Sequence, residues 1–387
     1  MYQDSRFLKW FGLIVIAGPI GAVGAYLLKS GIAGLNAINP LPVWMGPTAA
    51  GLCMALITHW DKRILGSGAK QFVKALSEED TDFSLTTAFS KLVSTVATLG
   101  FGASGGTEGP ALMIGAWLGG GINKLPGIRS LFSKDSRLLV LCSASAMLGA
   151  AFGSPVGAGL FVIETVSALQ YQEVLPTLAS SIIGSLVYGE MQTGGALLNI
   201  PYYEPRINDL PYIISAAAVS ALLSLVFIKV YSFSENGFQK IRQVRLRLIL
   251  GGILTSTVLM LAPSAGGIGL DFIQDLLQGR VISIGMLLFL PFAKTLATSS
   301  TVGSGQSGGL VVPALFLGSL AGTLVNRLVG LRFTAPLIIA GMGAALAGIA
   351  KVPLAASVIL LELGGSAFAA PAVIGSVIGY LVTYRDE

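Results

Sequence analysis

Charged residues, cysteine and histidine are all scarce in this sequence. Of its 387 residues only 11% are charged, whereas 53% are hydrophobic. A soluble domain carries about 25% charged residues, so this chain cannot cover itself with a charged surface. Cys53 and Cys142 lie in apolar segments, and the single histidine, His59, completes no metal-ligand set. The composition therefore predicts an integral membrane protein, without a disulfide framework, metal site or other cofactor.

The placement of the few charges predicts the topology. Residues 1–9 are polar and the run 10–28 is long enough to cross about 30 Å of hydrocarbon, so no cleavable signal peptide is evident. Basic residues gather in three clusters: Arg6 and Lys9; Lys62, Arg63, Lys70 and Lys74; and Lys240, Arg242, Arg245 and Arg247. By the positive-inside rule these clusters and the N-terminus are cytoplasmic, and the long, charge-poor stretch 194–211 is external. Apolar flanks favour a topology signal over a nucleic-acid patch in the third cluster, and His59 beside Trp60 is typical of an interfacial anchor.

Apolar segments recur along the whole chain. They cover residues 10–28, 40–60, 88–101, 110–122, 138–151, 156–169, 176–190, 211–230, 247–262, 281–299, 311–325, 335–350, 352–364 and 371–383. Several are too short to cross a membrane alone, and glycine or proline interrupts them. The 50 glycines fit closely packed, discontinuous helices, which occur at membrane depth only where they are buried in protein or line a cavity.

The chain contains an internal duplication. Residues 91–125 align without a gap on residues 294–328, with 15 of 35 positions identical. Residues 155–164 likewise match 353–362 in spacing, so Glu164 and Glu362 end corresponding apolar segments. Duplication explains this better than shared low complexity does. Repeats with glycine- or proline-interrupted segments are typical of transport proteins, whose sites form at the repeat interface.

Three glycine-rich junctions, at residues 66–69, 106–110 and 308–313, are the candidate ion site. A proline opens or nearly opens an apolar helix in the last two, where the first N–H groups have no partner within the helix. These amides and the positive end of the helix dipole form an anion site. Glycines such as Gly68 and Gly109 permit an ion to approach the backbone closely, and Ser67 offers a hydroxyl donor. The alternative is that these glycines only allow close packing.

Glu108 is an ionisable residue inside an apolar, glycine-flanked region, where such residues are usually functional. A carboxylate at a helix N-terminus would occupy the same site as an anion and compete with it, and protonation would free the site. Glu108 is therefore a candidate gate and proton carrier, with a capping carboxylate as the alternative. Glu164 and Glu362 could be interfacial caps, and this reading is preferred for Glu362.

The motifs GSGAKQF, GTEGP and GGLVVP, with Lys91 seventeen residues before Glu108, resemble the GSGIP, GREGP and GxFxP signatures of the CLC family of chloride channels and chloride/proton antiporters. The resemblance covers nearly the whole chain. It implies an all-α polytopic fold of two inverted repeats of tilted, discontinuous helices, divided here as residues 1–200 and 201–387, without a cytoplasmic regulatory domain. It also implies a homodimer with one pore per subunit, chloride and protons as the transported ions, and, for a compact prokaryotic-type member, the plasma membrane.

The same resemblance assigns residues to roles. It places Ser67 and the amides of Leu310 and Val311 at the central chloride site, and it makes Glu108 the external gating glutamate. Thr107 stands where the family has arginine, and Val311 replaces the aromatic residue of GxFxP. Many antiporters carry a second, proton-transferring glutamate after the position of Glu164, where this chain has Thr165, so these two residues mark the inner proton path. The sequence stops soon after the last apolar segment, so the family's final helix and its chloride-coordinating tyrosine are expected to be missing.

Several functions are compatible with these motifs. Proton-coupled exchange is favoured over a passive anion channel because Glu108 is retained, and Ser67 argues for chloride over fluoride. Ser104 and Ser307 each match G-x-S-x-G, which raises an intramembrane serine protease, but His59 cannot serve as base for two symmetric serines. A cation transporter would need several buried acids. The sequence thus predicts a transporter and no enzyme.

Overall fold

The computed structural model describes residues 2–77, 84–127, 136–166, 170–192, 197–331 and 334–384, without the side chains of residues 2–9. The predictions that concern residues 194–196 and the chain end 385–387 lie outside these residues, and those that concern Arg6 and Lys9 rest on side chains that are not described. The helices are α1 (Tyr2–Ile38), α2 (Gly46–Ile57), α3 (Ala69–Ser77), α4 (Leu85–Gly100), α5 (Glu108–Ile122), α7 (Ser136–Phe152), α8 (Gly157–Thr165), α9 (Tyr171–Met191), α10 (Leu210–Gln239), α11 (Val244–Leu261), α12 (Leu270–Leu277), α13 (Ile284–Gly303), α14 (Val311–Val329), α15 (Ala335–Ala350), α16 (Pro353–Gly364) and α17 (Ala369–Thr383).

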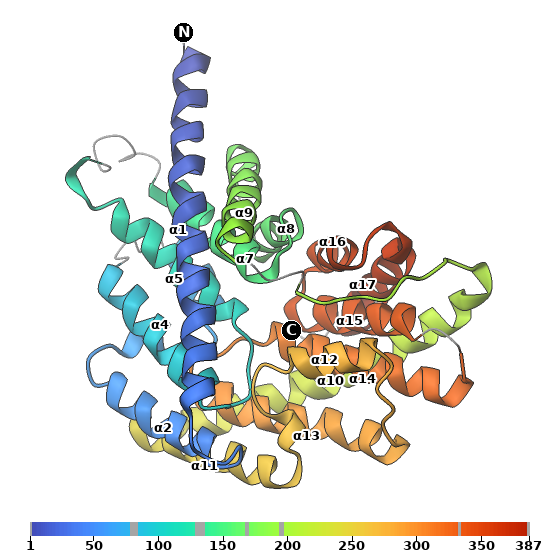
Figure 1. The fold of residues 1–387 in the computed structure, drawn as a ribbon. Helices are drawn as coiled ribbons and strands as arrows, with labels where there is room; N and C mark the ends of the chain where they lie inside the picture. Colours follow the sequence, from blue (N-terminus) through green and yellow to red (C-terminus); the bar gives the residue numbers. More distant parts are fainter. Residues whose placement is uncertain are drawn as a thin grey trace.

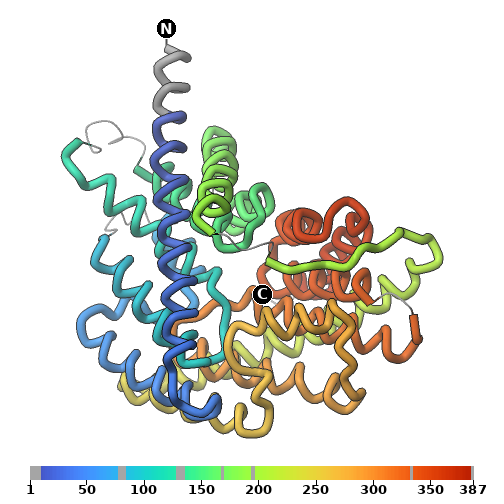
Figure 2. Tube along the Cα trace, viewed as in Figure 1, coloured from blue at the N-terminus to red at the C-terminus, as the bar shows by residue number. Residues whose placement is uncertain are grey.

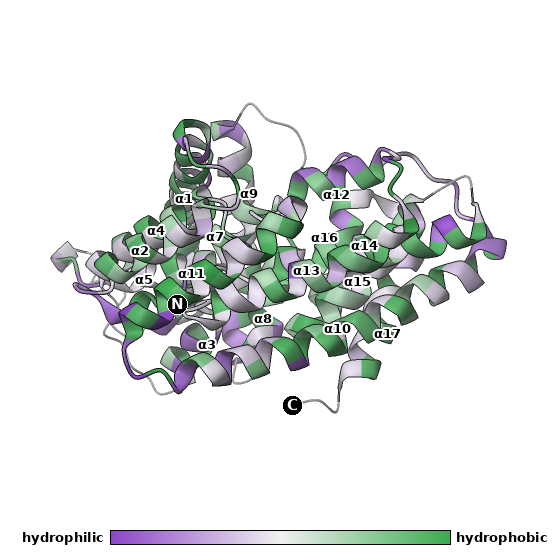
Figure 3. Ribbon diagram, turned by 90° about the horizontal axis from the view of Figure 1, so that it is seen from below, coloured by the Kyte–Doolittle hydropathy of each residue, from purple (hydrophilic) through white to green (hydrophobic). Residues whose placement is uncertain are grey.

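The predicted all-helical membrane fold is confirmed in the described ranges (Figure 1). Six helices there are long and apolar enough to cross a membrane: α1, α9, α10 with the short turn before it, α11, α14 and α17 with the turn before it. Apolar residues run along most helices in Figure 3, while hydrophilic residues gather at loops and helix ends. Helices such as α5, α8 and α16 are too short to span a bilayer, as the glycine and proline interruptions predicted. The short helices α3 and α12 lie outside the predicted apolar segments.

Two helices extend beyond their apolar runs. The first was expected to end near residue 28, but α1 continues through Lys29 to Ile38. The Lys29 ammonium lies 4.7 Å from the centre of the Tyr188 ring of α9, so an aromatic neighbour accommodates the charge inside the helix. Similarly, α10 runs nine residues past the expected end at residue 230. Hydropathy therefore located the spans but underestimated the helices.

The two halves meet through contacts that recur in pairs about one axis. Figure 2 shows α11 (yellow) of the second half beside α2 (blue) of the first, and the two helices pack together. On the axis, the amides and carbonyls of Gly106 and Gly309 exchange hydrogen bonds of 2.8 and 2.6 Å. Away from it, two hydroxyl pairs form at corresponding positions: Thr95 with Ser307 at 2.7 Å, and Ser104 with Thr298 at 2.9 Å. The boundary between the repeats at residue 200 stays a prediction.

A second pair of reciprocal contacts joins α8 to α16. The Glu164 carboxylate, at the end of α8, accepts the backbone N–H groups of Leu354 and Ala355 in the first turn of α16, at 3.0 and 2.6 Å. The Glu362 carboxylate, near the end of α16, accepts those of Val156 and Gly157 at the start of α8. Each helix thus ends in an acid that satisfies the unpaired amides of the other helix.

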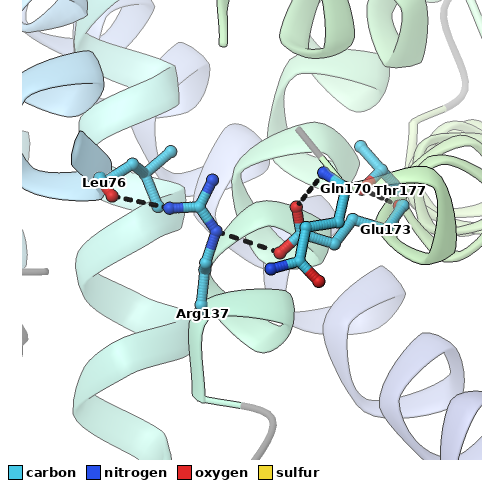
Figure 4. Close-up of polar contacts among 5 residues, drawn as sticks. All are labelled: Leu76, Arg137, Gln170, Glu173 and Thr177. Atoms are coloured by element: carbon cyan, nitrogen blue, oxygen red, sulfur yellow. Dashed lines mark hydrogen bonds and ion pairs between the residues drawn. The ribbon is translucent and has the colours of Figure 1, made fainter. Parts of the chain in front are cut away.

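Arg137 fixes the position of α3, which begins directly after Ser67 and Gly68 of the first glycine-rich junction. Its guanidinium bonds the Glu173 carboxylate of α9 at 2.9 Å and the carbonyl of Leu76, near the end of α3, at 2.6 Å (Figure 4). Glu173 in turn accepts the amide of Gln170 at 2.9 Å, which caps α9. Because the pair is largely buried and multiply bonded, it anchors α3 more firmly than an exposed ion pair would.

Candidate functional site

Glu108 begins α5 and its side chain is 3% exposed. The Thr107 hydroxyl donates to Oε1 at 3.0 Å. The carboxylate lies near the backbone amide of Val312, in the first turn of α14, and its buried Oε2 has no hydrogen-bond partner among the described residues. The carboxylate therefore lies where the N-termini of two helices meet, in a position where their free N–H groups favour negative charge.

The backbone segments around the Glu108 carboxylate lie so close together that only glycine fits. A Cβ on Gly106 would lie 2.2 Å from Glu108 Oε2, and one on Gly309 would lie 3.2 Å from the same atom. A Cβ on Gly109 would come within 2.4 Å of the Ser67 carbonyl oxygen, and one on Gly68 within 2.8 Å of the Gly109 carbonyl oxygen. The three glycine-rich junctions predicted from the sequence thus converge on one place.

The Ser67 junction has a structural counterpart in the second half. Gly66 and Gly68 have φ of +74° and +94°, and Gly267 and Gly269 have φ of +58° and +94°. Each pair of glycines immediately precedes a short helix, α3 or α12. The residue between them is Ser67 in one half and Ile268 in the other, so only the first half places a hydroxyl there.

Two buried lysines hold these two turns, and neither was predicted as a site residue. The Lys91 ammonium donates to the carbonyls of Ile64 and Gly66 at 2.7 and 2.6 Å. The Lys294 ammonium donates to those of Ala265 and Gly267 at 3.2 and 2.9 Å. Both lysines are fully buried. They are the first identical pair of the aligned repeats, and a lysine inside an apolar segment was a signal that could have found them.

A cavity of about 460 Å³ opens beside the carboxylate. Its lining contains four predicted anion-site residues, Ser67, Gly109, Leu310 and Val311. Gly68 and Glu108 do not line it: Gly68 packs against Gly109, and Glu108, the residue before Gly109, is buried. The other lining residues are Ala69, Lys70, Val73, Lys74, Leu112, Phe161, Thr165, Tyr231, Ile349 and Ala350.

Thr165 and Glu164, the two residues predicted for an inner proton path, lie in different surroundings. Thr165 lines the cavity, and its hydroxyl oxygen is buried without a hydrogen-bond partner in the described part of the chain. Glu164 instead bonds the first turn of α16. A further carboxylate, Glu235 at the end of α10, contacts two lining side chains: it pairs with Lys70 at 2.8 Å and lies 3.4 Å from the Tyr231 hydroxyl.

The two G-x-S-x-G serines lack the neighbours that a nucleophile needs. Ser104 and Ser307 are fully buried, and the hydroxyl of each pairs with a threonine. His59 lies at the end of α2 and contacts Arg245 at 2.7 Å. Because a serine nucleophile requires a base within hydrogen-bonding reach, this geometry does not support proteolysis.

A buried carboxylate at two helix N-termini, with a cavity beside it in a duplicated helical membrane fold, defines an ion-transport protein. The chain belongs to the voltage gated chloride channel family, whose sequence profile matches residues 49–384. An uncharacterized protein of Methanocaldococcus jannaschii is 28% identical over 383 residues, which cover 98% of this chain and 94% of that protein. The H(+)/Cl(-) exchange transporter ClcA of Vibrio campbellii is 24% identical, covering 93% and 82%. The solved structure of a slow cyanobacterial Cl-/H+ antiporter shares the fold, with a TM-score of 0.83, 19% identity and coverage of 97% and 94%.

Proposed function

We propose that this protein carries chloride across the membrane in exchange for protons, with Glu108 as the protonatable gate. The observation that carries the proposal is the position of the Glu108 carboxylate, buried between the first turns of α5 and α14. A carboxylate there stands in for a bound anion, because it is offered the same backbone N–H groups. Membership in the family and the exchange activity named for the Vibrio relative support this reading.

The geometry suggests how the two ions compete. When ionised, Glu108 fills the anion site and blocks it. Protonation removes its charge, so the side chain can leave and a chloride ion can bind near Ser67 and the amides of Leu310 and Val311. Return of the carboxylate displaces the chloride. Because proton and chloride occupy the site in turn, their movements are linked.

Protons reach Glu108 from the inner side through the cavity. Thr165 contributes a hydroxyl to this route, and Glu164 is held at the start of α16. We assign the inner proton relay to Glu235, because its carboxylate contacts the cavity residues Tyr231 and Lys70. A hydroxyl between a carboxylate and a cavity large enough to hold water molecules is suited to proton transfer.

The molecular setting follows from the charge placement and the family. The basic clusters support a cytoplasmic N-terminus. Membership in the family supports a plasma membrane protein of prokaryotic type that acts as a homodimer. The repeats divide near residue 200. Ser67 supports chloride over fluoride as the transported anion.

Chloride flux from reconstituted liposomes, recorded together with proton flux, tests the proposal. A chloride gradient should drive protons against their own gradient. Glu108→Gln should keep chloride flux, abolish its dependence on pH and stop proton movement. Chloride flux without any proton movement in the wild-type protein would overturn exchange and leave the passive channel, and unchanged pH dependence in Glu108→Gln would remove this residue from the gate.

A further inference from the structure

The packed helices α2 and α11 have surface features, where α2 ends and α11 begins, that the proposed ion transport does not use. These helices pack closely: a Cβ on Gly51 would lie 2.6 Å from the Leu248 carbonyl oxygen, and one on Gly252 would lie 2.4 Å from that of Pro47. Beyond this contact, α2 ends at Ile57 and α11 begins at Val244. Two adjoining hollows lie at this end, one basic and one apolar.

The basic hollow is a pocket of about 550 Å³ with three cationic side chains in its lining, Lys62, Arg242 and Arg245. The rest of the lining is Thr58, His59, Gln243 and Val244. No carboxylate pairs with any of the three cations within the described residues. Uncompensated like charges around one pocket favour an anionic occupant.

His59 lines this pocket and contacts one of its three cations. The Arg245 guanidinium, which can only donate, lies 2.7 Å from His59 Nδ1. That contact orients the Arg245 fork, and a planar guanidinium matches two oxygens of a phosphate.

The apolar hollow adjoins the pocket and shares His59 and Arg245 with it. It is a groove of about 630 Å³ whose other lining residues are Leu52, Ala55, Leu56, Trp60 and Ile249. Leu52, Leu56 and Trp60 are 49%, 66% and 79% exposed. Trp60 next to a basic pocket is typical of the depth at which headgroups meet acyl chains.

We propose that the pocket and groove together bind one anionic phospholipid, with its phosphate between Lys62, Arg242 and Arg245 and an acyl chain along Leu52 and Leu56. A free phosphate ion would use the pocket but leave the groove empty, whereas a zwitterionic lipid would bring its own cation to the three side chains. With the cytoplasmic orientation proposed above, the site faces the leaflet whose anionic headgroups attract basic segments.

The test is lipid retention by the full-length protein during detergent exchange, measured by native mass spectrometry. The probes are phosphatidylglycerol and phosphatidylcholine with identical acyl chains. Wild type should retain phosphatidylglycerol in preference to phosphatidylcholine. Lys62→Gln, Arg242→Gln and Arg245→Gln should each lower that preference by roughly fivefold, the factor expected for one basic residue near an anionic surface. Lys240→Gln, a neighbouring cation outside the lining, is the matched control and should leave the preference unchanged.

Three results would overturn the proposal. The first is equal retention of the two lipids by wild type. The second is an equal loss of preference in Lys240→Gln, which would indicate only a diffuse surface charge. The third is full displacement of phosphatidylglycerol by inorganic phosphate, which would assign the pocket to a free anion. Chloride flux in mixed vesicles, measured on the same variants, shows that each is folded.

Discussion

Replacing Gly106 by alanine should force the gate open without mutating the gating residue, Glu108. The new methyl carbon would lie 2.2 Å from Glu108 Oε2. Non-bonded heavy atoms pack best at about 3.5 Å, so the overlap is about 1 Å. The carboxylate is the end of a flexible side chain, and it should move rather than the backbone. Even about 3 kcal/mol of repulsion would lower its occupancy of the site roughly 100-fold.

In wild type, flux should rise as the pH falls, because protonation removes the charge that holds the carboxylate at the helix N-termini. Gly106→Ala should instead give a high chloride flux at neutral pH, close to the wild-type flux at acid pH. The assay is chloride efflux from proteoliposomes over a range of pH. Gly105→Ala is the matched control, since a Cβ there meets only ordinary contacts at 3.4 Å and should leave the pH profile unchanged.

A double variant separates the gate from a general distortion. In a Glu108→Ala background there is no carboxylate to displace, so Gly106→Ala should add little; the remaining close contact is 3.2 Å to the Val312 amide nitrogen. An equal effect of Gly106→Ala with and without the carboxylate would refute the reasoning, as would a wild-type pH profile in the single variant. Elution by size exclusion confirms that each variant folds.

Three other perturbations test separate contacts. Lys91→Met should weaken chloride binding, measured by calorimetry, by about tenfold, because it releases the turn that carries Ser67. Lys294→Met should change chloride binding by less than about twofold, and equal effects of the two variants would count against this asymmetry. Glu164→Ala and Glu362→Ala should each lower stability by about 1–2 kcal/mol, because each leaves the first turn of the opposite helix without its acceptor, and thermal melting in detergent that shows no change would disprove the caps. Glu235→Gln should preserve chloride flux and reduce the number of protons moved per chloride; an unaltered ratio would exclude it as the inner relay.

Much of the fold follows from the sequence because hydropathy and interruptions are local properties. The apolar runs located nearly every helix, and the aligned glycines located the junctions that meet at the site. The ends of the helices were harder to predict from the sequence. Lys29 ends an apolar run, yet α1 continues because Tyr188, on a helix far along the chain, packs against the ammonium. Such compensation depends on a tertiary neighbour that no local pattern contains.

The site shows the same division between local and long-range information. That Glu108 lies at a helix N-terminus follows from the neighbouring glycine and proline, but the approach of Val312 from the second half does not. The capping role preferred for Glu362 could be inferred from its place at a segment end. That Glu362 caps α8 and Glu164 caps α16 could not be inferred, because it depends on how these two distant helices pack.

The paired contacts between the halves have a consequence for descent. In an isologous dimer, two identical subunits meet through the same surface, so every contact occurs twice with the roles of the subunits exchanged. The contacts between the two halves follow this pattern. A single ancestral half, self-associating, would have formed the Gly106–Gly309 exchange and both glutamate caps from one gene, with identical side chains on either side of the axis. Two copies that have separate sequences, as the halves of this chain do, are free of that constraint. One side of the axis can then carry an acid, Glu108, while the aligned position has an apolar residue, Val311, so that a symmetric scaffold holds a single titratable group.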